Sequence, residues 1–173
     1  MKHKKYCYLM LPLFVLPLPG FAAASCTSTA TPIAFGAYDP LSASNANATG
    51  IISLSCTSTN LLNLGPSTVS FDITLSKGIA NSYATRQMAN NINTANRLNY
   101  NLYTSTNYST VWGDGTGGSS KVSGTGTFPA NLLGIGSNIV INTNVYGRIP
   151  GATQRTVKIG SYSDNIIVTV TYQ

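Results

Sequence analysis

The segment GSYSDNIIVTVTYQ, residues 160–173, decides the fold of this chain. After a turn-like start it alternates in polarity, and one side of it is apolar or aromatic: Ile166, Val168, Val170 and Tyr172. Such a period of two is typical of a β-strand with one buried face. The sequence ends at Gln173 while the alternation still runs, and we therefore expect the free edge of this strand to need a partner.

The rest of the sequence repeats this strand pattern between turn signals. Six further runs have it: residues 32–38, 50–58, 68–76, 97–105, 121–128 and 138–149. Segments rich in Gly, Asp and Asn separate the runs, and residues 84–96 are so rich in Asn that we expect a loop there. Strands at this spacing predict an all-β fold, an antiparallel β-sandwich formed by one domain.

Residues 1–24 have the features of a signal peptide. Three lysines precede an apolar segment, residues 6–18, that is short for a bilayer span, and Ala22-Ala23-Ala24 supplies a cleavage site. We expect an exported domain of residues 25–173 that does not insert into a membrane. A membrane anchor, or lipoprotein cleavage before Cys26, are the alternatives.

Two cysteines remain in the expected mature domain, Cys26 and Cys56. In an oxidising compartment an even pair predicts a disulfide, with free thiols as the alternative. The bond would close a loop of about 30 residues and stabilise the fold by roughly 3–4 kcal/mol on the chain-entropy model.

The composition of the mature domain excludes several kinds of chemistry. The one histidine is His3, and glutamate is absent, so neither a Ser-His-Asp triad nor an ordinary zinc site is available. A pair of catalytic carboxylates would have to come from turn-like or outward-facing positions: Asp39, Asp72, Asp114 and Asp164. We expect no enzymatic activity, no cofactor and no metal.

Charge and aromatic content leave fewer functions open. Three of the 10 lysines and arginines lie in residues 1–24, so the mature net charge is about +3. The remaining cations are scattered, which does not favour nucleic-acid binding.

The segment WGDGTGG (112–118) lacks the Lys-Ser/Thr ending of a phosphate loop, and we expect a hairpin loop there. Several aromatic residues are candidates for either the core or a sugar-binding surface: Tyr100, Tyr103, Tyr108, Trp112, Tyr146 and Tyr162.

The motifs, taken in order, resemble the spore coat protein U domain family. They are FGAYDP (35–40), LSKG (75–78), Arg86-Gln87-Met88, LNYNLYTS (98–105), WGDGTG (112–117), VYGRIP (145–150) and GSYSDNIIVTVTYQ (160–173). The family includes secreted spore-coat components and subunits of archaic chaperone–usher pili. The resemblance implies an immunoglobulin-like sandwich lacking its last strand, which a periplasmic chaperone and then a neighbouring pilin subunit supplies at the outer-membrane usher.

The resemblance also implies a route from the periplasm to a surface fibre, with the edge at Ile166, Val168, Val170 and Tyr172 bordering the groove for the partner strand. Residues 25–31 lack the large apolar anchors of a donor strand, so we expect a tip or minor subunit that only accepts one. The alternatives are a self-complete adhesin or sugar-binding module, a spore-coat structural protein, and, last, an enzyme.

Overall fold

The computed structural model describes residues 24–58, 66–130, 137–151 and 153–173, so the predicted signal peptide lies outside the described residues except for Ala24. The described residues form strands and no helix, and none therefore forms a helix able to cross a membrane. The strands are β1 (Ala24–Ala30), β2 (Ala46–Ser58), β3 (Ser67–Leu75), β4 (Arg86–Asn90), β5 (Arg97–Tyr103), β6 (Val122–Phe128), β7 (Asn138–Ile149), β8 (Tyr162–Ser163) and β9 (Val168–Tyr172).

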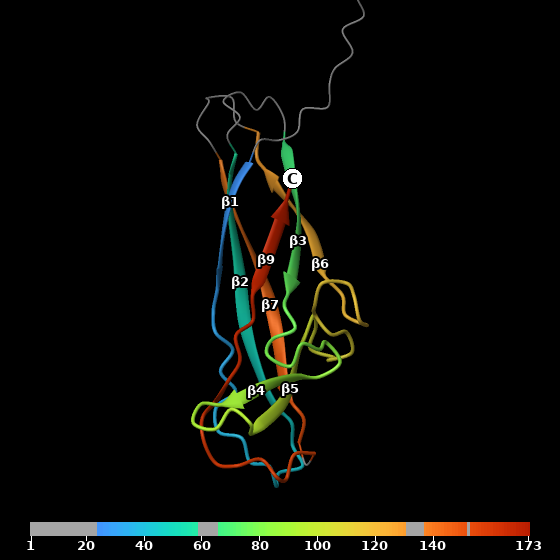
Figure 1. The fold of residues 1–173 in the computed structure, drawn as a ribbon. Coiled ribbons are helices and arrows are strands. Elements are labelled where there is room, and N and C mark those ends of the chain that lie inside the picture. The colour runs from blue at the N-terminus through green and yellow to red at the C-terminus, as the bar shows by residue number, and fades with distance from the viewer. Residues whose placement is uncertain (1–23, 59–65, 131–136, 152) are drawn as a thin grey trace, which may run out of the picture.

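The strands form two antiparallel sheets that face each other. The larger sheet has the order β1-β2-β7-β5-β4-β8, and the smaller one has the order β6-β3-β9. In Figure 1 β9 passes in front of β7 with β3 and β6 to its right, and β4 and β5 lie across the lower part of the molecule. This arrangement confirms the predicted all-β, immunoglobulin-like sandwich.

The core lies between the sheets, where the predicted period of two is realised. Along β3, the inward side chains of Val69, Phe71, Ile73 and Leu75 are buried while the polar residues between them are only partly covered. Ile52, Leu54 and Cys56 of β2 face them from the other sheet. The disulfide of Cys26 and Cys56 is present, and it joins residues that lie directly opposite each other on β1 and β2.

Residues 32–38 do not form the predicted strand. They cross the inner face of the larger sheet at two glycines: a β-carbon on Gly50 would lie 2.7 Å from Ile33, and one on Gly147 would lie 2.7 Å from the ring of Phe35. Ile33 and Phe35 thus occupy the space that the missing side chains leave. The sequence pattern thus predicted correctly which side chains pack inward, but the prediction of strand pairing for residues 32–38 was wrong. The residues that pair with β2 are the preceding ones, in β1.

Part of the predicted loop at residues 84–96 is strand β4, and its first residue is a buried arginine. The guanidinium of Arg86 donates hydrogen bonds to the carbonyls of Ser76 and Trp112 and to Oδ1 of Asn101. Burial lowers the pKa of Arg86. Because these acceptors come from three segments, Arg86 fixes them around one point, and it is not one of the scattered surface charges.

Replacing Gly147 tests the packing of residues 32–38. Gly147→Val should lower the free energy of unfolding by about 1–3 kcal/mol, because the new side chain overlaps the Phe35 ring. Urea unfolding of the oxidised protein measures the change. Asn144→Val adds the same side chain to the exposed face of the same strand and should alter stability by less than about 0.5 kcal/mol. Equal stability of both variants would contradict the close contact of Phe35 with Gly147.

Candidate functional site

An apolar groove opens between a segment near the start of the described chain and a segment near its end. Its walls are residues 30–35, which follow β1, and residues 162–168, which lead into β9. Its floor is made of core side chains from five strands: Ile52, Leu75, Met88, Leu102 and Val145. A second depression, lined by residues 33–38 and Val157 among others, lies next to the first and shares Ile33, Phe35, Met88 and Tyr162 with it.

Strand β9 borders this groove with a free edge. Among the described strands it pairs only with β3. Ser70 and Gln173 exchange two main-chain hydrogen bonds, and Ser76 N–H donates to the carbonyl of Ile167. In an antiparallel pair, every second residue of a strand directs its main-chain N–H and C=O groups toward the same neighbour. The odd-numbered residues of β9 therefore bond to β3, and the main-chain groups of Val168 and Val170 point away from β3.

The predicted edge residues lie along this border, to different extents. Ile166, Val168 and Val170 are half-buried and pack against the core, and the first two line the groove. Tyr172 is 39% exposed and is not among the groove-lining residues. Ile167, on the opposite face, is 64% exposed, so the predicted alternation of this segment is present. Val168 and Val170 therefore combine a side chain that points inward with main-chain groups on the free edge.

The opposite wall also offers free main-chain groups. Thr31 is the last residue of that wall whose main chain bonds to β2, through N–H to the carbonyl of Ile51. Within the described part of the chain, no backbone–backbone hydrogen bond involves residues 32–38. This segment is held by its side chains instead: Ile33 and Phe35 pack on the sheet, and the Tyr38 hydroxyl donates to the carbonyl of Pro150.

Asp164 fixes the point where the chain enters the groove wall. Its carboxylate accepts hydrogen bonds from the Tyr100 hydroxyl (2.7 Å), the Ile79 N–H (3.0 Å) and the Asn165 N–H (2.8 Å). Burial, followed by the hydrogen bond to Asp164, raises the pKa of Tyr100, so its hydroxyl stays a donor at any ordinary pH. The carboxylate thus ties the segment before β9 to the loop after β3 and to β5.

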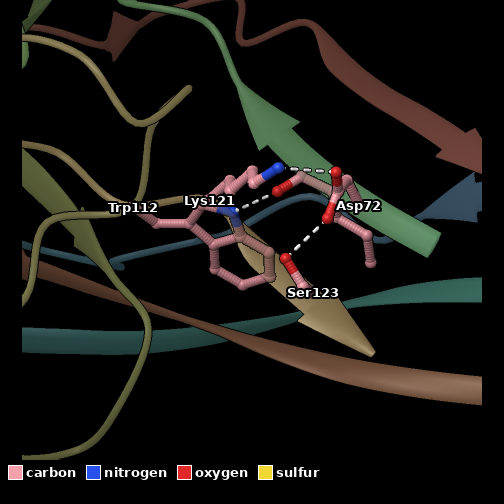
Figure 2. A network of polar contacts seen from close by, with 5 residues as sticks. Asp72, Trp112, Lys121 and Ser123 are labelled. Carbon is pink, nitrogen blue, oxygen red and sulfur yellow. Dashed lines mark hydrogen bonds and ion pairs between the residues drawn. The ribbon is translucent and has the colours of Figure 1, made fainter. Parts of the chain in front are cut away.

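The other aspartates have separate structural partners. Asp72 accepts from Lys121 Nζ and from the Ser123 hydroxyl on the outside of the smaller sheet, and these hydrogen bonds lower its pKa (Figure 2). On the buried side of the same strand, the Trp112 indole N–H donates to the carbonyl of Ile73. Asp114 accepts from Thr116 within the predicted hairpin loop. In the described residues no three Asp, Glu, Cys or His side chains gather around a possible metal position.

The aromatic residues predicted for the core or for a sugar-binding surface divide among three places. Tyr100 and Trp112 are buried in the core, and Tyr162 lines the groove. The remaining three lie away from the groove on or beside the outer face of the larger sheet: Tyr103, Tyr108 and Tyr146. Sequence reasoning named these residues but had no signal for their division, because it depends on which strands become neighbours.

Tyr100→Phe tests the attachment of Asp164. The variant should lose about 1–3 kcal/mol of stability, since the partly buried carboxylate loses one donor, and amide protons of β9 should exchange faster than in the parent. Hydrogen exchange read by mass spectrometry measures this. Tyr103→Phe removes a hydroxyl that has no hydrogen-bond partner in the described residues and should leave β9 unchanged. Equal exchange of β9 in all three proteins would contradict the proposed attachment.

Comparison with known proteins agrees with the geometry. No curated protein sequence matches the chain. The sequence model of the Spore Coat Protein U domain matches residues 15–169, a match that begins within the predicted signal peptide and covers most of the chain. At the level of the family, this domain is a structural one of chaperone–usher pilus or fibre subunits and not an enzymatic one. The predicted resemblance is confirmed, and the chain belongs to the Spore Coat Protein U domain family.

Proposed function

We propose that this protein is an exported structural subunit of a surface pilus or fibre, and that its groove binds a β-strand from a partner. The partner is a periplasmic chaperone during transit and a neighbouring subunit after delivery to the outer-membrane usher. The observation that carries the proposal is the free edge of β9 beside an apolar groove. An exposed strand edge over apolar side chains favours aggregation, and an added strand removes both hazards.

The geometry supports a strand as the ligand of this groove. Val168 and Val170 offer main-chain groups on one wall, and residues 32–38 offer them on the other. A strand lying between the walls would direct every second side chain toward the floor at Leu75 and Leu102. Alternating large apolar residues would therefore fill the groove while the main chain pairs at both edges.

The same geometry supports the role of strand acceptor. Residues 24–30, the segment that would have to act as a donor, form β1 in the protein's own sheet. Cys26 is covalently bound to Cys56, and the register continues to the pair of Ala30 and Ile52. This segment is short of large apolar side chains and is already paired, so we propose that it does not serve a neighbour.

A fused strand tests the groove without a known partner. A flexible linker and a segment of alternating valine and threonine, added after Gln173, should raise the melting temperature by at least about 10 °C, because several valines become buried. The control carries the same linker with every valine replaced by serine and should change little. If both fusions melt at the parent's temperature, the groove does not accept a strand.

Substitutions on β9 test the edge directly in cells that produce the fibre. Val168→Lys should reduce recovery of the chain in chaperone complexes and fibres at least about tenfold, since a charge would enter the apolar groove. Thr169→Lys places the same charge on the exposed face of the same strand and should be tolerated. Equal recovery of both variants, or a parent chain that stays soluble and monomeric without any chaperone, would favour a self-complete module instead.

Cross-linking tests the proposal that the chain only accepts a strand. In isolated fibres, the unreduced Cys26–Cys56 peptide should come from one subunit, and cross-links of a neighbour should involve the β9 edge. Mass spectrometry of cross-linked, unreduced fibres reads both. Cross-links that place residues 24–35 in the groove of the next subunit would reject the acceptor-only role.

A further inference from the structure

The outer face of the larger sheet carries a cluster of three tyrosines and one arginine, which we call the tyrosine–arginine face: Tyr103, Tyr108, Tyr146 and Arg148. Tyr103 on β5 lies directly opposite Tyr146 on β7, and Arg148 follows two residues later on the same side of β7. Tyr108, from the loop after β5, packs edge-to-face on Tyr103 with ring centroids 5.4 Å apart. All four side chains are half-buried, so each also has an exposed part.

Arg148 is held in one orientation. Its guanidinium carbon lies 3.5 Å from the centroid of the Tyr108 ring, and its Nε donates a 2.9 Å hydrogen bond to Oδ1 of Asn47. Among the described residues the two terminal nitrogens have no hydrogen-bond partner, and no carboxylate lies within 4 Å of them. The planar edge that binds a carboxylate bidentately is therefore fixed and free.

The backbone of Tyr108 is in the left-handed region, with φ of 54°. Asn81 is the other non-glycine residue with positive φ in the described chain, and Asn adopts this conformation far more readily than Tyr does. A bulky residue in this region is strained, and such strain is concentrated at functional sites. Here it places the ring beneath the guanidinium of Arg148.

We propose that the tyrosine–arginine face binds an acidic polysaccharide, with the carboxylate of a uronate residue on Arg148. The ring of Tyr146 would pack against the apolar face of a sugar, and the exposed side chains of Asn47, Thr49 and Asn144 would hydrogen-bond its hydroxyls. Three neighbouring strands span about 10 Å, comparable to a disaccharide. The four aspartates lie elsewhere in the fold, so no like charge opposes the ligand.

This face is independent of the groove. Inward residues Val145 and Ile149 of β7 belong to the core, whereas Tyr146 and Arg148 alternate with them and point outward. A strand bound beside β9 would therefore leave the face uncovered. Polysaccharide binding and strand binding are therefore separate properties, and loss of one would leave the other intact.

Binding of defined polymers to the exported chain, purified with any chaperone that accompanies it, tests the proposal. Calorimetry should show binding of polygalacturonate that weakens with salt, and no binding of neutral dextran. Arg148→Gln should weaken binding about tenfold or more, and Arg148→Lys should not restore it, because an ammonium lacks the planar fork. Arg97→Gln makes the same charge change at another exposed position on the larger sheet and should alter affinity less than twofold.

Two tyrosine variants separate ligand binding from folding. Tyr108→Phe keeps the ring under Arg148 and should bind like the parent, whereas Tyr108→Asn suits the left-handed backbone, removes the ring and should weaken binding while the melting temperature holds. Tyr146→Ser should weaken polygalacturonate more than polyphosphate. Equal weakening of polygalacturonate and polyphosphate binding in Tyr146→Ser, equal losses in Arg148→Gln and Arg97→Gln, or no binding of polygalacturonate would each overturn the proposal.

Discussion

Hydrogen bonding of β9 along one edge only is the constraint on which the other features depend. The odd-numbered residues of β9 use their main-chain groups to pair with β3. At Val168 and Val170, therefore, the side chain points toward the core while the main-chain groups point to the free edge. Any segment that hydrogen-bonds to this edge must therefore lie over the apolar floor. Main-chain pairing and side-chain burial would then occur together, and a bound segment would have to be extended and to alternate in polarity.

The two walls of the groove are held by different forces. The wall before β9 is fastened by hydrogen bonds to the carboxylate of Asp164. The wall of residues 32–38 is fastened by the fit of Ile33 and Phe35 over two glycines, which leaves its main chain without backbone partners in the described chain. Beside the floor of the groove, Arg86 holds three segments together by donating hydrogen bonds to their uncharged oxygen atoms. Side chains thus keep the groove in shape while its main-chain edges stay available.

The period of two predicted the large strands well, because at β2, β3 and β7 burial and pairing go together. It was wrong at residues 32–38, where Ile33 and Phe35 are packed inward although the main chain is not paired. Strand β4 was missed because Arg86 and Asn90 look like surface residues until their acceptors are known. The disulfide was predicted from an even pair of cysteines in a chain expected to be exported, and it is present. The tyrosine–arginine face depends on the β5–β7 register, which no local pattern contains.

The cross-strand disulfide has a mechanical consequence. If subunits join as proposed, tension in the fibre would pass into each subunit through a partner strand between residues 32–38 and β9. It would then act in shear on rows of main-chain hydrogen bonds rather than on one bond at a time. The wall that receives this load continues directly into β1, which Cys26 clamps to the adjoining strand. Peeling of β1 that began at Ala30 would therefore stop at Cys26, so tension could not pull the whole of β1 from its sheet.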